Sequence, residues 1–187
     1  MSAVKTKRFS IEEYHQLSDL GFFAPEERVE LIRGEIVAMA AKGTPHSVCN
    51  TRLFRQLTLQ LGDNAIVRSQ EPIVLFPNSE PEPDLSVVRY REDEYLSAHP
   101  QPDDVLLVVE IADSTLKVDR DLKLSLYAEY GIANYWIFNL VDRRLETYSE
   151  PLPKAKTYRS RRVFFPSETV KLPCFPNVDV DLNLIFP

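Results

Sequence analysis

Hydrophobic and polar residues follow two different periods along this chain, and the points where the period changes mark the predicted elements. Near the start, Ser10 and Glu13 match a capping box, and Gly21 supplies a stop signal. This pattern predicts a short first helix that ends at the glycine.

A second helix is predicted from leucines at helical spacing. Thr44 is expected to cap it, with Pro45 at its first position, and Gly62 marks its end. Its predicted buried stripe consists of Leu53, Phe54, Leu57 and Leu61.

The other apolar runs are typical of strands. Residues 29–32 and 35–39 flank the turn 33–34 and predict a tight hairpin. The run 105–111 is almost continuously apolar, which indicates a strand covered on both faces. Further strands are expected at 65–76, broken or bent at Pro72, and at 84–88, 134–138 and 145–148. The order predicts one α/β domain over residues 1–187, a mixed central sheet flanked by helices, with additional hairpins.

One lysine interrupts this pattern. Residues 119–130 are predicted to form a helix, and Lys123 falls in the middle of its apolar stripe. An ammonium group that points toward a core must snorkel outward, lose its charge or meet a carboxylate, because burial of an isolated charge is costly. The stripe consists of Leu122, Leu126, Tyr127 and Tyr130.

Three carboxylates occupy inward-facing positions of predicted strands. Asp84 opens one strand and Glu110 lies near the end of another. If these strands are antiparallel neighbours, the start of one lies beside the end of the other and the two carboxylates converge. Glu30 shares a face of the hairpin with apolar residues. The alternatives are a turn or strand-entry residue for Asp84, a structural partner of Lys123 for Glu110, and an exposed hairpin face for Glu30.

Further polar residues could support such a site. His46 and Asn50 project on the inward face of the second helix near its N-terminal end, where they either join the site or only cap their helix. Gln70, on the strand beside Asp84, either touches a metal-bound water or faces solvent.

Two strand carboxylates beside an amine suit divalent-metal phosphodiester chemistry. Mg²⁺ prefers oxygen ligands, keeps several waters and takes one or two protein carboxylates, which Asp84 and Glu110 would supply. The metal lowers the pKa of bound water and shields charge that develops on the phosphate, and a lysine such as Lys123 steadies that charge. We therefore expect Mg²⁺ or Mn²⁺ as the cofactor.

Charge restricts the kind of partner. The 187 residues carry a net charge of −6, so the chain has no global basic field that attracts nucleic acid without specificity. The two cysteines and three histidines have no metal-type spacing, which makes a zinc cluster or a disulfide framework improbable. A local basic run either tracks a phosphate backbone or forms a solvated hairpin edge. It consists of Lys154, Lys156, Arg159, Arg161 and Arg162, with Tyr158 among them.

Four phrases occur in order along the chain. They are 29–35 (VELIRGE), 83–88 (PDLSVV), 109–115 (VEIADST), and 123–127 followed by Gly131 and Tyr135-Trp136. Together they resemble the PD-(D/E)XK restriction-endonuclease-like superfamily, and within it the "putative restriction endonuclease" group. The superfamily's lysine usually lies two residues after the glutamate, where this chain has Ala112. In the group that the chain resembles, the lysine has migrated to the following helix, at Lys123.

The resemblance implies a restriction-endonuclease-like fold and a metal-dependent nuclease that hydrolyses DNA phosphodiester bonds. The implied catalytic residues are Asp84, Glu110, Lys123 and Glu30. The implied metal ligands are Asp84, Glu110 and the backbone carbonyl of Ile111. The alternative is a non-catalytic nucleic-acid-binding or interaction protein that keeps the constellation as an ion pair.

Two expectations concern location and assembly. The sequence shows no long apolar run and no charged-then-apolar leader, so we expect no membrane span and a cytoplasmic protein. Because one carboxylate site cuts one strand at a time, we also expect a homodimer that acts on duplex DNA.

Overall fold

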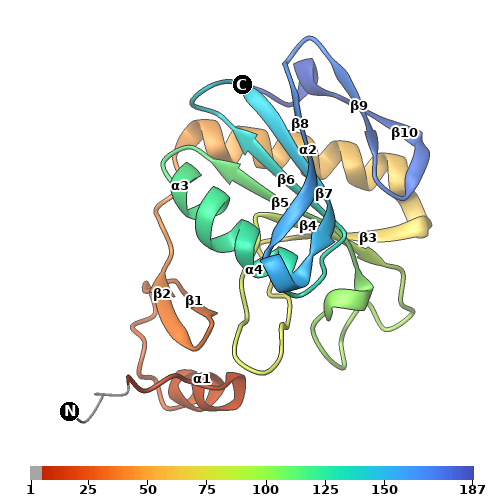
Figure 1. The fold of residues 1–187 in the computed structure, drawn as a ribbon. Helices are drawn as coiled ribbons and strands as arrows, with labels where there is room; N and C mark the ends of the chain where they lie inside the picture. The colour runs from red at the N-terminus through yellow and green to blue at the C-terminus, as the bar shows by residue number, and fades with distance from the viewer. Residues whose placement is uncertain (1–5) are drawn as a thin grey trace.

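A mixed sheet of six strands forms the centre of the fold in this computed structural model, which describes residues 6–187 (Figure 1). The strand order is β3-β4-β5-β6-β7-β8. β5 and β6 run parallel, and the other neighbouring pairs are antiparallel. The strands are β3 (Ala65–Ser69), β4 (Leu85–Arg89), β5 (Val105–Ala112), β6 (Asn134–Asn139), β7 (Arg144–Leu152) and β8 (Thr157–Phe164).

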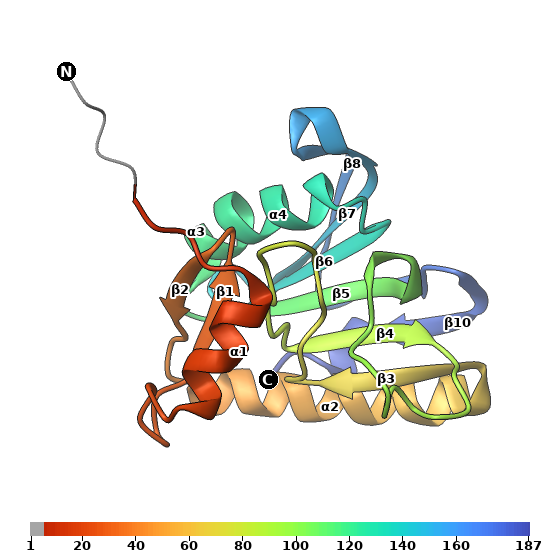
Figure 2. The ribbon, with the colours of Figure 1, turned by 90° about the horizontal axis from the view of Figure 1, so that it is seen from below.

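Helices cover both faces of this sheet, as the order of elements predicted. In Figure 2, α2 (Thr44–Leu61) lies along one face, while α3 (Leu116–Val118) and α4 (Leu124–Glu129) lie on the other. α1 (Ile11–Asp19) packs beside the hairpin of β1 (Val29–Ile32) and β2 (Glu35–Ala38). A second hairpin consists of β9 (Thr169–Leu172) and β10 (Phe175–Asp181). Short 3-10 turns lie at Gly62–Asn64, Pro102–Asp104, Pro153–Ala155 and Leu182–Leu184.

The capping signals at the two long N-terminal helices have different outcomes. The predicted capping box of α1 is present, because Ser10 and Glu13 each bond the other's backbone N–H. The predicted cap of α2 is wrong. Gly43 is the N-cap and Thr44 is already the first helical residue, so Pro45 stands second.

The buried stripe of α2 is narrower than predicted. Leu53, Leu57 and Leu61 are fully buried against the sheet, since residues four apart lie on one helix face. Phe54 is 36% exposed, which corrects its predicted place in this stripe. It follows Leu53 by about 100° around the helix and so turns away from the sheet.

Two turns end strands at residues with left-handed backbone. The predicted hairpin of β1 and β2 is confirmed, with Arg33 and Gly34 at positive φ in its two-residue turn. A Cβ on Gly34 would lie 2.8 Å from the Cβ of Arg8, so the close approach also requires glycine. The strand predicted at 65–76 stops earlier, at Ser69, because Gln70 with φ 57° turns the chain out of the sheet.

β5 separates the two halves of the core. Leu107, Val109 and Ile111 pack on the side of α2, and Val108 and Ala112 pack on the side of α4. The side chain of Glu110 shares the second side by this alternation. The fold therefore places one carboxylate of a buried strand directly beneath the segment that carries Lys123.

That segment is not a regular α-helix. The helix predicted at 119–130 begins earlier, at Leu116, and residues Asp119–Lys123 form a π-helical turn between α3 and α4. The backbone N–H of Leu124 bonds the carbonyl of Asp119, five residues back, which widens the helix by one residue.

Candidate functional site

The strand carboxylates converge as the strand pattern predicted. β4 and β5 are antiparallel with Leu85 opposite Val109, so Asp84 and Glu110 are brought together at the start of one strand and the end of the other. The backbone N–H of Asp84 lies 3.4 Å from Glu110 Oε2, and the backbone N–H of Ile111 donates to Asp84 Oδ2 at 2.9 Å. Both carboxylates are buried.

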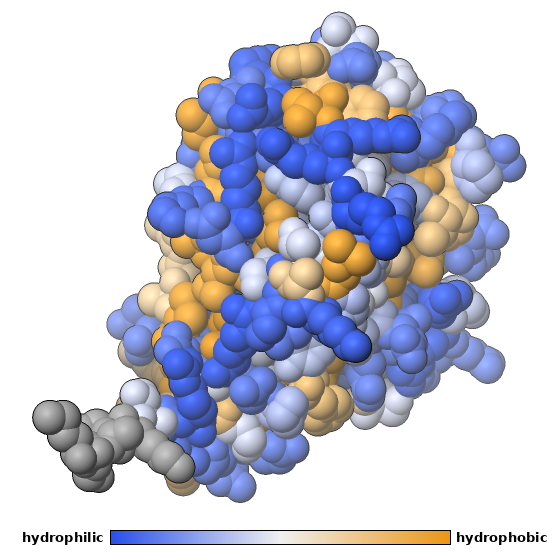
Figure 3. All heavy atoms as spheres, in the orientation of Figure 1, coloured by the Kyte–Doolittle hydropathy of each residue, from blue (hydrophilic) through white to orange (hydrophobic). Residues whose placement is uncertain are grey.

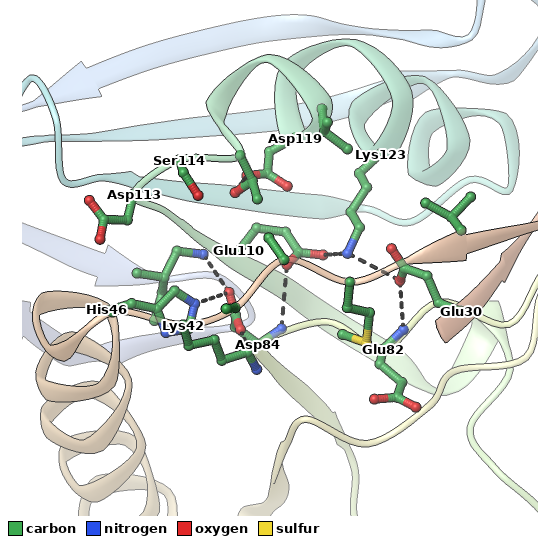
Figure 4. Close-up of a pocket in the computed structure, with 18 of the residues that line it drawn as sticks. Glu30, Lys42, His46, Glu82, Asp84, Glu110, Asp113, Ser114, Asp119 and Lys123 are labelled. Atoms are coloured by element: carbon green, nitrogen blue, oxygen red, sulfur yellow. Dashed lines mark hydrogen bonds and ion pairs between the residues drawn. The ribbon is translucent and has the colours of Figure 1, made fainter. Parts of the chain in front are cut away.

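Lys123 meets two of these acidic side chains. Its Nζ lies 3.0 Å from Glu110 Oε1 and 3.2 Å from Glu30 Oε2 (Figure 4). Tyr127, one turn further along, donates its hydroxyl to the same Glu110 oxygen at 2.8 Å. The predicted encounter between a lysine on an apolar stripe and strand carboxylates is thus present.

Glu30 is held in place by the loop that precedes β4. The backbone N–H of Glu82 donates to Glu30 Oε2 at 3.1 Å, and the Glu30 side chain is buried. The exposed alternative for Glu30 is therefore excluded, whereas Glu35 at the turn is exposed. The N-terminal hairpin delivers one carboxylate to a site built mainly by the central sheet.

Asp84 has two basic neighbours, of which sequence reasoning found one. His46 Nε2 lies 2.9 Å from Asp84 Oδ2, at the N-terminal end of α2. Lys42, in the loop between β2 and α2, places Nζ 3.2 Å from Asp84 Oδ1, and this buried Nζ has no hydrogen-bond partner among the described residues. Asn50 points elsewhere and donates to Ser69 Oγ at 3.0 Å.

Asp119 is a second residue that the sequence reasoning missed. It stands at the start of the π-helical turn, is buried, and accepts a hydrogen bond from Thr115 Oγ1 at 2.7 Å. It lines the same cavity of about 160 Å³ as Asp84, Glu110 and Lys123. Its position four residues before Lys123 puts both on one helix face, which is the signal that could have revealed it.

The buried charges perturb one another. Burial would raise the pKa of Asp84, but the His46 hydrogen bond, the Ile111 amide and Lys42 lower it below the ordinary value. Burial raises the pKa of Glu110 above its ordinary value, and Asp84 adds to this effect while Lys123 opposes it.

The same balance applies on the helix side of the cavity. Burial raises the pKa of Asp119 to about 6, with Thr115 and Lys123 opposing. Burial disfavours the charged form of Lys123, but Glu110, Glu30 and Asp119 outweigh it and raise its pKa above the ordinary value. Such shifts are typical of functional sites, although structural ion pairs also produce them.

The acidic side chains of the cavity bear on whether it can hold a metal ion. Within residues 6–187, no group of three or more His, Cys, Asp or Glu side chains is arranged to hold a metal ion. Asp84 and Glu110 nevertheless lie side by side in a cavity that also exposes Asp113 and Ser114, and Mg²⁺ needs only one or two carboxylates because it retains waters. A cation already sits at Asp84 in the form of the Lys42 ammonium group, so the donor set fits a cation at this oxygen.

Gln70 is not part of this cavity. Its backbone N–H donates to the Asp84 carbonyl at 3.1 Å, but its side-chain oxygen accepts from Arg28 at 3.4 Å. Ile111 lines the cavity and presents its amide to Asp84, and the role predicted for its carbonyl stays a prediction.

The predicted basic run does not form one surface. Lys156 pairs with Glu129 at 2.7 Å, and Arg159 lies 3.5 Å from Glu150. Arg161 lies on the side of the sheet that carries α4, whereas Arg162 lines a separate cavity on the other side. Lys154 is exposed in the turn before β8.

Residues 11–183 match the Uma2 family, which is described as "Putative restriction endonuclease". The chain therefore belongs to this family, and the predicted family resemblance is confirmed. No curated protein matches the chain.

A solved structure shares the fold. It is a "putative nuclease belonging to DUF820 from Anabaena variabilis ATCC 29413", and it superposes with a TM-score of 0.71 at 16% sequence identity. The alignment covers 95% of this chain and 97% of that chain. Family and fold together support a nuclease-like function. In the part of the chain that the structure describes, no helix is long and apolar enough to cross a membrane.

Proposed function

We propose that this protein is a metal-dependent nuclease that hydrolyses phosphodiester bonds in DNA. The observation that supports this most is the convergence of Asp84, Glu110 and Lys123 in one buried cavity, at the place where β4 begins and β5 ends. Family membership supports the same class of reaction.

Each residue has a separate task in this proposal. Asp84 and Glu110 would hold the metal, with the Ile111 carbonyl as a third ligand. When bound, Mg²⁺ or Mn²⁺ acidifies a coordinated water and neutralises charge on the phosphate. Lys123 steadies the charge of the scissile phosphate, and Glu30 orients Lys123 through the contact at 3.2 Å.

His46 acts as a positioning residue. Its ring nitrogen contacts Asp84 Oδ2, the oxygen that also accepts the Ile111 amide, so Oδ1 is the oxygen left to face a cation. An orienting contact of this kind behind a metal ligand commonly tunes metal affinity.

A nuclease assay tests the proposal. Supercoiled plasmid and single-stranded DNA are incubated with Mg²⁺ or Mn²⁺ and with the wild type, with Asp84→Asn, or with Glu92→Gln as an exposed control. We expect cleavage by the wild type and the control, none by Asp84→Asn, and none in the presence of a chelator. Wild-type cleavage by Asp84→Asn would refute the assigned site.

A second candidate function is a non-catalytic nucleic-acid-binding protein. Lys42 and His46 contact Asp84, and Lys123 contacts two glutamates. These contacts favour the second function, because a network that balances its own charge needs no metal ion to compensate its carboxylates. Thermal unfolding separates the two functions. A metal site raises the melting temperature when Mg²⁺ or Mn²⁺ is added, and a plain ion network leaves it unchanged.

We also propose that the protein works in the cytoplasm as a homodimer on duplex DNA. β8 is an edge strand of the central sheet and offers unpaired backbone groups for a second copy. Light scattering tests the assembly. A mass near the 21.5 kDa of the monomer, with and without duplex DNA, would exclude the dimer.

A further inference from the structure

A second cluster of charged residues lies outside the cavity, around Glu146 of β7. The Glu146 side chain is completely buried on the face of the sheet that carries α4. Its oxygens accept hydrogen bonds from Arg161 at 3.0 Å and from Arg120 at 3.1 Å, and Arg144 contacts it at 3.3 Å. Tyr148 adds its hydroxyl at 2.8 Å. We call Arg120, Arg144 and Arg161 the arginine cluster.

The arginine cluster carries more positive charge than its acidic partners remove. Glu146 neutralises one of the three guanidinium groups, and Asp142, 2.8 Å from Arg144, offsets a second. One positive charge is left over on a protein whose net charge is −6. This surface therefore carries a local excess of positive charge, which favours contact with a polyanion.

The guanidinium groups are both fixed and accessible. Their side chains are 31% exposed for Arg120 and Arg144 and 50% exposed for Arg161. Arg161 also stacks over the ring of Tyr148, with 5.9 Å to the ring centroid. Each guanidinium has five N–H donors, and the buried carboxylate uses only some of them. Fixed donors lose little conformational entropy when they bind an anion.

The arginine cluster adjoins the candidate site through the π-helical turn. Arg120 directly follows Asp119, which lines the cavity, and Lys123 of the same turn contacts Glu110. In the space-filling view, strongly hydrophilic side chains lie on this face with hydrophobic ones interspersed among them (Figure 3).

We propose that the arginine cluster binds the phosphodiester backbone of a nucleic acid and holds the strand beside the cavity. Guanidinium groups match phosphate oxygens through paired N–H donors. The inference rests on the proposed function, because it assigns the path of the substrate of that same site. The arginine cluster shares only Arg161 with the predicted basic run. Its other two members, Arg120 and Arg144, lie outside that run.

Fluorescence anisotropy of a labelled DNA duplex tests the proposal in the presence of a chelator, so that binding is measured without cleavage. We expect Arg161→Gln to weaken binding roughly fivefold and to reduce the salt slope of the affinity by about 0.9, as for one lost phosphate contact. Arg55→Gln is the matched control. Arg55 is exposed on α2, so this substitution removes the same charge from the opposite side of the sheet. Its affinity and salt slope should equal those of the wild type.

Further variants separate a specific site from general attraction. Arg161→Lys should restore the salt slope but only part of the affinity, since an ammonium group keeps the charge and loses the paired geometry. Equal losses in Arg161→Gln and Arg162→Gln would mean that the whole basic run attracts DNA, and would overturn the cluster. Equal losses of affinity in Arg161→Gln and Arg55→Gln would mean that net charge alone determines binding, and would also overturn the cluster.

The two proposals fail in distinguishable ways. If the wild type binds DNA through Arg161 but cleaves none with either metal, the nuclease proposal fails and the arginine cluster stands. If it cleaves DNA and Arg161→Gln binds as well as the wild type, the cluster fails alone. A wild type that neither binds DNA at low salt nor cleaves it with either metal overturns both. Circular dichroism of each variant checks that the fold is retained.

Discussion

Replacing Glu146 by glutamine measures how strongly the buried carboxylate stabilises the fold. Burial disfavours its charge, but the hydrogen bonds from Arg120, Tyr148 and Asn139 lower its pKa from 4.5 to about 2. Such a fall corresponds to about 3 kcal/mol of stability at neutral pH, at about 1.4 kcal/mol for each tenfold change in the ionisation constant. Because the arginine side chains are partly exposed, solvent screens some of this, and we expect Glu146→Gln to cost about 2 kcal/mol.

The pH dependence of this loss has a definite sign. A carboxyl whose pKa is lower in the folded state stabilises the protein above its unfolded pKa and loses that contribution as the pH falls through its folded pKa. The difference between the wild type and Glu146→Gln should therefore be full above a pH of 4.5 and shrink as the pH falls toward about 2.

Urea unfolding followed by circular dichroism provides the measurement, near neutral pH and at about pH 3. Glu150→Gln is the control, because Glu150 stands on the same strand but is 60% exposed, and its free energy of unfolding should change by less than about 0.5 kcal/mol. A difference that does not change with pH would show that Glu146 acts through packing and not through its charge. A loss below about 0.5 kcal/mol at neutral pH would refute the reasoning altogether.

Three other variants test the candidate site. Lys42→Ala removes the ammonium group next to Asp84 Oδ1, so calorimetry should show tighter Mn²⁺ binding, and weaker binding would contradict a competing role. Lys123→Met leaves two buried glutamates without their shared counter-charge, so urea unfolding should show a loss of about 3 kcal/mol and the nuclease assay a loss of cleavage. Wild-type values in both would make Lys123 dispensable. Tyr127→Phe removes one hydrogen bond to Glu110 and should cost about 1 kcal/mol, and an unchanged midpoint in urea would argue that the hydroxyl is not bonded in solution.

The sequence contained enough information to bring the carboxylates together. The apolar runs of β4 and β5 identified two buried strands, and an antiparallel arrangement was sufficient to pair Asp84 with Glu110. Lys123 could be identified because a charged group within an apolar stripe must reach solvent, lose its charge or pair with an opposite charge. The prediction succeeded although the turn is π-helical, because the stripe extends into α4, where Leu126 and Tyr127 are buried.

Other parts of the site depend on information that periodicity does not carry. Lys42 lies in a loop, whose path is set by the relative placement of β2 and α2 and not by any repeat in the sequence. The direction of Gln70 follows from a single positive φ, which hydrophobic periodicity does not reveal. Arg161 and Arg162 are adjacent on β8, so strand alternation places them on opposite faces, and only the pairing of β8 with β7 shows which of them meets Glu146.

The π-helical turn at Asp119–Lys123 makes the length of this segment as important as its composition. The turn contains one residue more than an α-helical path would need, so it sets the phase between Arg120, which contacts Glu146, and Lys123, which contacts Glu110. Loss of one residue between Arg120 and Lys123 would leave two residue steps where there are now three, so the angle between these side chains would change and the contacts with Glu146 and Glu110 could not both be kept. In this segment, insertions and deletions are therefore expected to be less tolerated than substitutions at exposed positions such as Asp121.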